Sequence, residues 1–215
     1  MAAFSPIAAA SHGRPILMAI VGSGGVLSAV HALQGGADLV QVRAKELTGC
    51  DLMALVRAVV AAIGDGDRVI VNGRPDIAHL AGARGVHLPE SGLDPREVRR
   101  VFPGLLVGVS RHDREGLERA VDERADYAML GPVFNTPGKA DRALGTVRFH
   151  EHVRGLSIPV IAVGGVAPGT VRATLDSGAS GIAAIRPFID AWMARTEAAS
   201  LRSALDLPDG TPRAF

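Results

Sequence analysis

Three polar side chains alternate along one short stretch that otherwise has the character of a buried strand. In ADLVQVRAKEL, from Ala37 to Leu47, Gln41, Arg43 and Lys45 are separated by small or apolar residues. Because successive side chains point to opposite faces of a strand, these three are expected on one face. An amide and two cations on one face of a buried strand predict contacts with a bound ligand.

Other apolar runs also end in residues that can bind ligands or move protons. Asn72 ends RVIVN, Ser110 and His112 end LLVGVSRH, and Thr136 and Lys139 follow the run Tyr127–Leu130. An imidazole titrates near neutral pH, so His112 is the candidate acid or base. His87 lies inside the apolar run GVHL and is interpreted as structural. Two later apolar runs end in positions whose backbone amides are candidates for binding a ligand: Gly164, Gly165, Ile185 and Arg186.

Strand-like and helix-like stretches alternate about eight times. The expected strands are PILMAIV, ADLVQVRAKEL, RVIVN, GVHL, LLVGVS, YAMLG, IPVIAVGG and GIAAI. Helices are expected over Val26–Leu33, Asp51–Ile63, Val147–Val153, Pro168–Ser177 and about Pro187–Leu205, among others. This order predicts an α/β fold, a single (β/α)₈ TIM barrel, whose active site gathers at the C-terminal ends of the strands. We expect a flexible arm over residues 1–14, the barrel over 15–206 and a tail over 207–215.

The composition excludes several classes of protein. The 215 residues carry 23 basic and 22 acidic side chains, so nothing indicates a nucleic-acid or anionic-membrane partner. Cys50 is the only cysteine, which rules out an intramolecular disulfide. No apolar run approaches the roughly 18 residues of a membrane span, and the first residues do not resemble a signal peptide. We therefore expect a cytoplasmic protein.

Seven segments, in order and spacing, resemble the thiamine phosphate synthase and TenI family of thiamin biosynthesis. They are QVRAK, VNGRPDIAHL, GVHLPESG, GVSRH, ADYAMLGPVFNTPGK, IPVIAVGGV and GASGIAAI. The resemblance implies a barrel mouth that holds a thiazole phosphate. The synthases also bind a pyrimidine pyrophosphate and join the two with Mg²⁺, whereas TenI-type members aromatise a thiazole precursor by a proton shift.

Two departures from the family pattern favour the TenI-type branch over the synthases. Synthases have aspartates after the third strand and in the fourth-strand loop, where this chain has Gly73 and the run Pro89-Glu90-Ser91-Gly92. Hard Mg²⁺ prefers carboxylate oxygens, so the resemblance here implies no metal site. A third departure points the other way: Pro132 stands where TenI-type members commonly have their catalytic histidine, and proline cannot transfer a proton.

The sequence therefore predicts a TenI-like protein that binds a thiazole phosphate and acts as a metal-independent tautomerase. Phosphate is expected between the Gly164/Gly165 turn and Ile185/Arg186, and Arg43 and Lys45 are expected to neutralise the carboxylate of the precursor. His112 and Lys45 are the candidate catalytic residues, and no cofactor is expected. A thiamine phosphate synthase, which would need Mg²⁺, and a non-catalytic binding or regulatory barrel stay open. The resemblance also implies a homodimer.

Overall fold

The computed structural model describes residues 14–136 and 142–207, and in this part strands and helices alternate along the chain. The strands are β1 (Ile16–Val21), β2 (Leu39–Val42), β3 (Val69–Asn72), β4 (Gly85–Leu88), β5 (Leu106–Arg111), β6 (Tyr127–Leu130), β7 (Val160–Val163) and β8 (Gly181–Ala184). The helices and short 3₁₀ turns are α2 (Val26–Gln34), α3 (Gly49–Ile63), η1 (Gly66–Arg68), α4 (Pro75–Leu80), α5 (Pro95–Val101), α6 (Arg114–Asp122), α7 (Gly145–Val153), α8 (Pro168–Asp176), η3 (Arg186–Phe188) and α9 (Ala191–Leu205).

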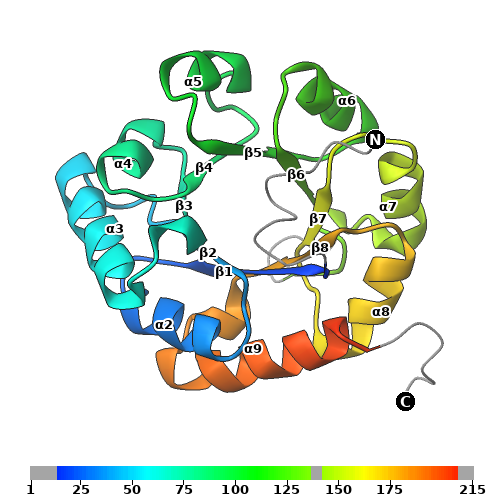
Figure 1. Cartoon of the computed structure of the whole chain (residues 1–215). Helices are drawn as coiled ribbons and strands as arrows, with labels where there is room; N and C mark the ends of the chain where they lie inside the picture. The colour runs from blue at the N-terminus through cyan, green and yellow to red at the C-terminus, as the bar shows by residue number, and fades with distance from the viewer. Residues whose placement is uncertain (1–13, 137–141, 208–215) are drawn as a thin grey trace.

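The strands form a closed barrel in chain order, and the helices surround it (Figure 1). Every strand pairs in parallel with its neighbours, and β1 closes the ring against β8 with Ile16 opposite Gly181. Parallel closure brings the C-terminal ends of all strands to one rim. The predicted (β/α)₈ barrel is confirmed.

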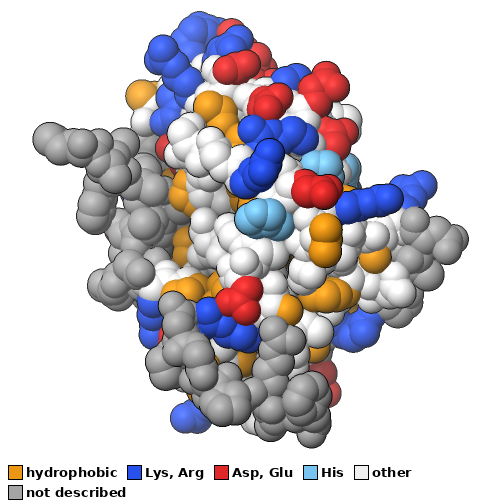
Figure 2. All heavy atoms as spheres, turned by 90° about the vertical axis from the view of Figure 1, so that its right-hand side faces the viewer, with side chains coloured by type: hydrophobic (Ala, Val, Ile, Leu, Met, Phe, Trp, Pro, Cys, Tyr) orange, Lys and Arg blue, Asp and Glu red, His pale blue; other side chains and the backbone are white. Residues whose placement is uncertain are grey.

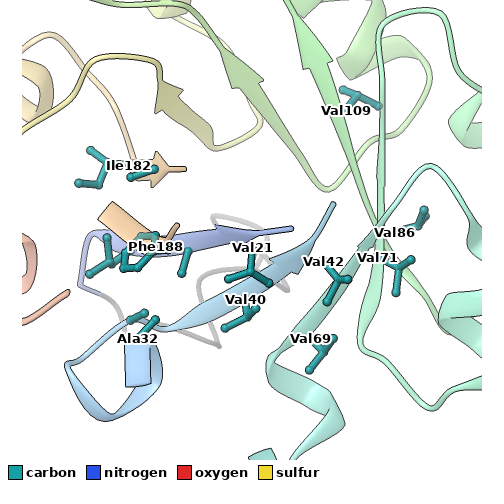
Figure 3. Packing of buried hydrophobic residues seen from close by; sticks show 14 of the residues in the cluster. Val21, Ala32, Val40, Val42, Val69, Val71, Val86, Val109, Ile182 and Phe188 are labelled. Carbon is teal, nitrogen blue, oxygen red and sulfur yellow. The ribbon is translucent and has the colours of Figure 1, made fainter. Parts of the chain in front are cut away.

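Side chains on the two faces of the barrel wall build two separate cores. Outward-facing residues such as Val40, Val42 and Val71 pack in the cluster shared with the helices (Figure 3). Inward-facing residues, among them Leu39 and Ile70, fill the barrel interior. Because both faces are buried, the strands are almost uniformly apolar, and a polar residue on the inner face stands out.

Side-chain caps set the start of several helices. Thr48 Oγ1 accepts a hydrogen bond from Asp51 N at 3.3 Å, so α3 begins at Gly49, two residues before the expected start. Asp190 accepts from Trp192 N at 2.9 Å and begins α9. The helix expected from Pro187 is therefore wrong at its start, because the turn η3 comes first and Asp190 then caps a new helix. Asp94 and Asp113 cap α5 and α6 in the same way.

The barrel elements run from Ile16 to Leu205, whereas residues 1–13 of the expected arm and 208–215 of the expected tail lie outside the described residues. On the face shown in Figure 2, acidic and basic side chains are interspersed. Within the described ranges, no helix is long and apolar enough to cross a membrane.

Candidate active site at the barrel mouth

Four polar side chains lie on the inner face of consecutive strands near the C-terminal rim. Gln41 follows the inward Leu39 by two residues, and Asn72 follows the inward Ile70 by two. His87 pairs in register with Asn72, and Ser110 lies two residues beyond Gly108, the partner of His87. The side-chain alternation of the strands thus gathers Gln41, Asn72, His87 and Ser110 at one end of the barrel.

Gln41 is a buried amide with an unsatisfied donor. The side chain is 1% exposed, and its Nε2 has no hydrogen-bond partner within the described ranges. A buried polar group without a partner is costly unless something else satisfies it. Gln41 is therefore the residue of this wall that most needs a partner from outside the protein, either a water molecule or a ligand.

Arg43 and Lys45 lie beyond the end of β2 and are exposed. The expectation that all three polar residues share one strand face is wrong for Arg43 and Lys45, because β2 ends at Val42 and the chain then turns at Lys45. Lys45 instead lines a cleft of about 230 Å³ together with Asn72 and Gly73. Arg74 also lines this cleft, but its guanidinium is paired with Asp76 at 2.5 Å. Lys45 thus remains available to an anion in the cleft.

His87, Ser110 and Tyr127 form a hydrogen-bonded group inside the barrel. His87 Nε2 lies 2.8 Å from Ser110 Oγ, and His87 Nδ1 lies 3.2 Å from the Tyr127 hydroxyl. Burial, followed by the positive charges of Arg43 and Arg111, lowers the pKa of His87 to about 3. Burial also raises the pKa of Tyr127. Both side chains are therefore neutral at physiological pH, which agrees with the structural interpretation of His87.

His112 lies at the rim with one ring nitrogen fixed. Its Nδ1 is 2.7 Å from the carbonyl oxygen of Gly131, which can only accept, so Nδ1 donates. In the neutral ring Nε2 then carries the lone pair, and it lies 3.8 Å from Glu90 Oε2. The side chain is 61% exposed. His112 can therefore take up a proton from a ligand at the mouth, and Glu90 can stabilise the charged ring.

The donor set at this rim does not fit a magnesium ion. Gly73 and the Ser91-Gly92 pair supply no carboxylate, and Glu90 is shared between His112 and Arg119, whose Nη2 lies 3.5 Å from Glu90 Oε1. In the described ranges, no three His, Cys, Asp or Glu side chains gather as a metal site. We therefore assign no step to the metal.

The predicted phosphate-binding positions lie after β7 and β8. Gly164 and Gly165 have φ values of +94° and +68°, which favour glycine, and a Cβ on Gly164 would lie 2.6 Å from Pro132 Cβ. Packing against the β6 loop therefore requires glycine at both positions, independently of any ligand that their backbone amides bind. Ile185 and Arg186 are exposed at the start of η3. Thr136 is half-buried in the β6 loop, whereas Lys139 lies outside the described residues.

A larger hollow of about 600 Å³ lies at the opposite end of the barrel, between Arg14, α8 and the end of α9. Its charged lining is engaged internally, since Arg14 pairs with Asp206 and Arg172 pairs with Asp176. It contains none of the predicted site residues. We therefore place the active site at the C-terminal rim, despite the smaller volume there.

The sequence missed three features of this site. From the sequence alone Tyr127 and Gly108 are only strand residues, and the proximity of Glu90 to His112 depends on two loops. A usable signal existed for the first two: His87, Gly108 and Ser110 occupy inward positions of neighbouring strands, and a glycine there leaves room for a large ring. The contact between Glu90 and His112 had no such signal.

Known proteins resemble this chain over most of its length. Residues 19–188 match the family described as thiamine monophosphate synthase (TMP-TENI). The chain is 39% identical over 178 residues to the thiamine-phosphate synthase of Thermus thermophilus, covering 81% of this chain and 85% of that protein. It is 37% identical over 181 residues to a putative thiamine-phosphate synthase of Geobacter sulfurreducens, covering 82% and 81%.

A solved structure gives the same result. The thiamine phosphate pyrophosphorylase of Pyrococcus furiosus superposes with a TM-score of 0.79 at 27% identity, covering 89% of this chain and 95% of that chain. The relatives are named for the synthase reaction, and none of these names supports the tautomerase. The barrel, the ordered motifs and these matches together show that the chain belongs to the thiamine monophosphate synthase and TenI family.

Proposed function

We propose that the protein is a transferase of thiamin biosynthesis that joins a hydroxymethylpyrimidine pyrophosphate to a thiazole phosphate. The observation that carries the proposal is the arrangement of β2 and the loop after it. Gln41 presents an unsatisfied amide inside the barrel, and Arg43 and Lys45 lie exposed beyond it at the rim. A ligand with a neutral nitrogen heterocycle and a pyrophosphate tail fits that order of groups. The names of the relatives support the same reaction.

The reaction needs stabilisation of charge more than it needs a proton. The bond between the pyrimidine methylene carbon and the pyrophosphate oxygen breaks, and the electron pair leaves on pyrophosphate. The thiazole ring nitrogen supplies the pair for the new carbon–nitrogen bond. Arg43 and Lys45 would stabilise the departing anion, since fixed positive groups act most strongly where charge develops. Gln41 would hold the pyrimidine ring in line with its attacker.

The thiazole phosphate would lie on the other side of the mouth. In this proposal its phosphate meets the turn at Gly164 and Gly165 and the start of η3 at Ile185 and Arg186. Barrels of this kind often bind phosphate after their last two strands. Thr136 and Lys139 of the β6 loop would complete the contacts with anionic groups.

The proposal is tested by measuring thiamine phosphate formation from the two substrates. Gln41→Met is expected to raise KM for the pyrimidine substrate about tenfold, because the substitution removes the buried Nε2–H donor and its hydrogen bond to the substrate. Lys45→Met is expected to lower kcat about 10²-fold. Arg57→Met, which removes an exposed positive charge from α3, is the control and should change neither. A wild-type protein that forms no product either with or without Mg²⁺ would refute the transferase.

A tautomerase is the second candidate, and one observation favours it. The fixed Nδ1–H of His112 leaves Nε2 as a base beside Glu90 at the mouth. The same preparation should therefore be assayed for isomerisation of the thiazole precursor. Isomerisation that His112→Gln abolishes, without condensation, would replace the transferase by the tautomerase. Binding of the thiazole phosphate without either reaction would indicate the non-catalytic barrel. The homodimer stays a prediction.

A further inference from the structure

A line of three polar side chains crosses three strands inside the barrel and ends at the mouth. Tyr127 on β6 and His87 on β4 are 0% and 2% exposed, and Ser110 on β5 is half-buried at the rim. His87 contacts the other two, through Nδ1 to Tyr127 and through Nε2 to Ser110. Neither His87 nor Tyr127 has a part in the chemistry proposed above.

The glycine at position 108 is what allows Tyr127 and His87 to meet. His87, Gly108 and Tyr127 lie in one row of the sheet, with β5 between the two side chains. A Cβ on Gly108 would lie 2.0 Å from Cζ of Tyr127, so the phenol ring passes directly over the backbone of β5. The two rings then lie 5.6 Å apart between their centroids. The contact is thus built into the register of three strands.

The protonation of the line follows from its burial. His87 is neutral, since burial lowers its pKa to about 3, and a neutral imidazole has one N–H and one bare nitrogen. Tyr127 keeps its proton, because burial raises its pKa. Within the described ranges, His87 Nδ1 is the hydrogen-bond partner of the Tyr127 hydroxyl.

Only one of the two imidazole tautomers satisfies both buried groups. If Nδ1 carried the proton, it would donate to the Tyr127 oxygen, and the buried phenol proton would have no acceptor. A buried donor without an acceptor is unfavourable. With a bare Nδ1, Tyr127 donates to it and Nε2–H donates to Ser110 Oγ. The hydroxyl proton of Ser110 is then free to point into the mouth.

We propose that Tyr127 and His87 are positioning residues that fix Ser110 as a hydrogen-bond donor toward the ligand. The matching group on the ligand is a hydrogen-bond acceptor at this wall, either an oxyanion or an unprotonated ring nitrogen. The inference rests on the proposed function only for the identity of the ligand, since both the pyrimidine ring and the pyrophosphate offer such acceptors.

The direct test is the protonation of the His87 ring in the ligand-free protein. Nitrogen-15 NMR of the full chain at neutral pH should show the Nε2–H form with a bare Nδ1, and His87→Gln identifies the signal among those of the seven histidines. An Nδ1–H ring, an averaged ring or a charged ring overturns the proposal. This result needs no ligand, so it stands or falls separately from the transferase activity.

Variants test whether the line acts through Ser110. His87→Gln keeps an N–H that can reach Ser110, whereas His87→Leu does not. Binding of hydroxymethylpyrimidine pyrophosphate should weaken by less than about threefold in His87→Gln and by about tenfold in His87→Leu. Equal losses in both variants would contradict the role of the donor.

Tyr127→Phe keeps the ring over Gly108 and removes only the hydroxyl. It should shift the Nδ1 resonance of His87, because that nitrogen loses its hydrogen bond. Met129→Leu, on the same strand and in the same inner core, is the matched control and should leave the resonance unchanged. An unchanged Nδ1 resonance in Tyr127→Phe would overturn the proposed hydrogen bond from Tyr127 to His87.

Discussion

Two buried polar residues on the inner face of the barrel differ in whether the protein satisfies them. His87 has a partner on each ring nitrogen, whereas Gln41 Nε2 has none within the described ranges. A satisfied buried group rigidifies its neighbours, and an unsatisfied one needs a partner from outside. This difference supports the positioning role proposed for His87 and the ligand contact proposed for Gln41.

The burial of His87 also predicts a pH dependence of stability. Its pKa is about 3 in the folded protein and near 6.5 when unfolded, so the unfolded chain binds the extra proton between these values. The contribution of His87 to the stability of the folded state is therefore complete above pH 6.5 and is lost as the pH falls toward 3, by on the order of 5 kcal/mol. Chemical unfolding of the wild type and of His87→Gln over this range measures the loss. Parallel curves for the two proteins would show that His87 does not titrate in this way.

At the scale of the elements, the sequence was most informative where a pattern repeats. The alternation of strand and helix predicted the barrel, because each β-strand and each helix has a characteristic pattern of apolar residues over several positions. Polar residues such as Asn72 and Ser110 at the ends of apolar runs predicted which rim carries the site. Both inferences need only local pattern and the rule that parallel strands share their C-terminal edge.

Other features depended on contacts between distant residues and could not be predicted. The end of β2 at Val42 moved Lys45 from a strand face into the cleft beside Asn72. The tautomer of His112 is set by the carbonyl of Gly131, on a different strand end. Nothing in the local sequence encodes these distances, because register and loop paths are set by the closed barrel.

At the scale of the whole molecule, one buried carboxylate ties the start of the barrel to its last helix. Asp38, which is 3% exposed, accepts hydrogen bonds from Leu17 N at 2.7 Å and from Arg202 Nη1 at 2.9 Å. Arg202 lies on α9 and also donates to the carbonyl of Pro15 at 2.7 Å. The group joins β1, the beginning of β2 and α9 at the end opposite the active site.

Removing the charge of Asp38 should therefore destabilise the whole barrel. Asp38→Asn leaves the buried Arg202 with only the exposed Asp206 as a counter-charge, and breaking one partner of a buried pair costs about 3–5 kcal/mol. Asp206→Asn is the control: it faces the same arginine but is 41% exposed, and it should cost less than about 1 kcal/mol. Urea unfolding measures both, and equal losses would contradict the role of Asp38 in closing the barrel.

We propose that β2 and the loop after it contact both the ring and the pyrophosphate of a pyrimidine pyrophosphate at the barrel mouth. The most direct measurement is calorimetric titration of the wild type and Gln41→Met with hydroxymethylpyrimidine pyrophosphate and with inorganic pyrophosphate, each with and without Mg²⁺. We expect the wild type to bind both ligands. We expect Gln41→Met to bind the pyrimidine ligand about tenfold more weakly and inorganic pyrophosphate equally well. Equal binding of the pyrimidine ligand by both proteins, or no binding by the wild type, would contradict the proposed ligand contacts of β2.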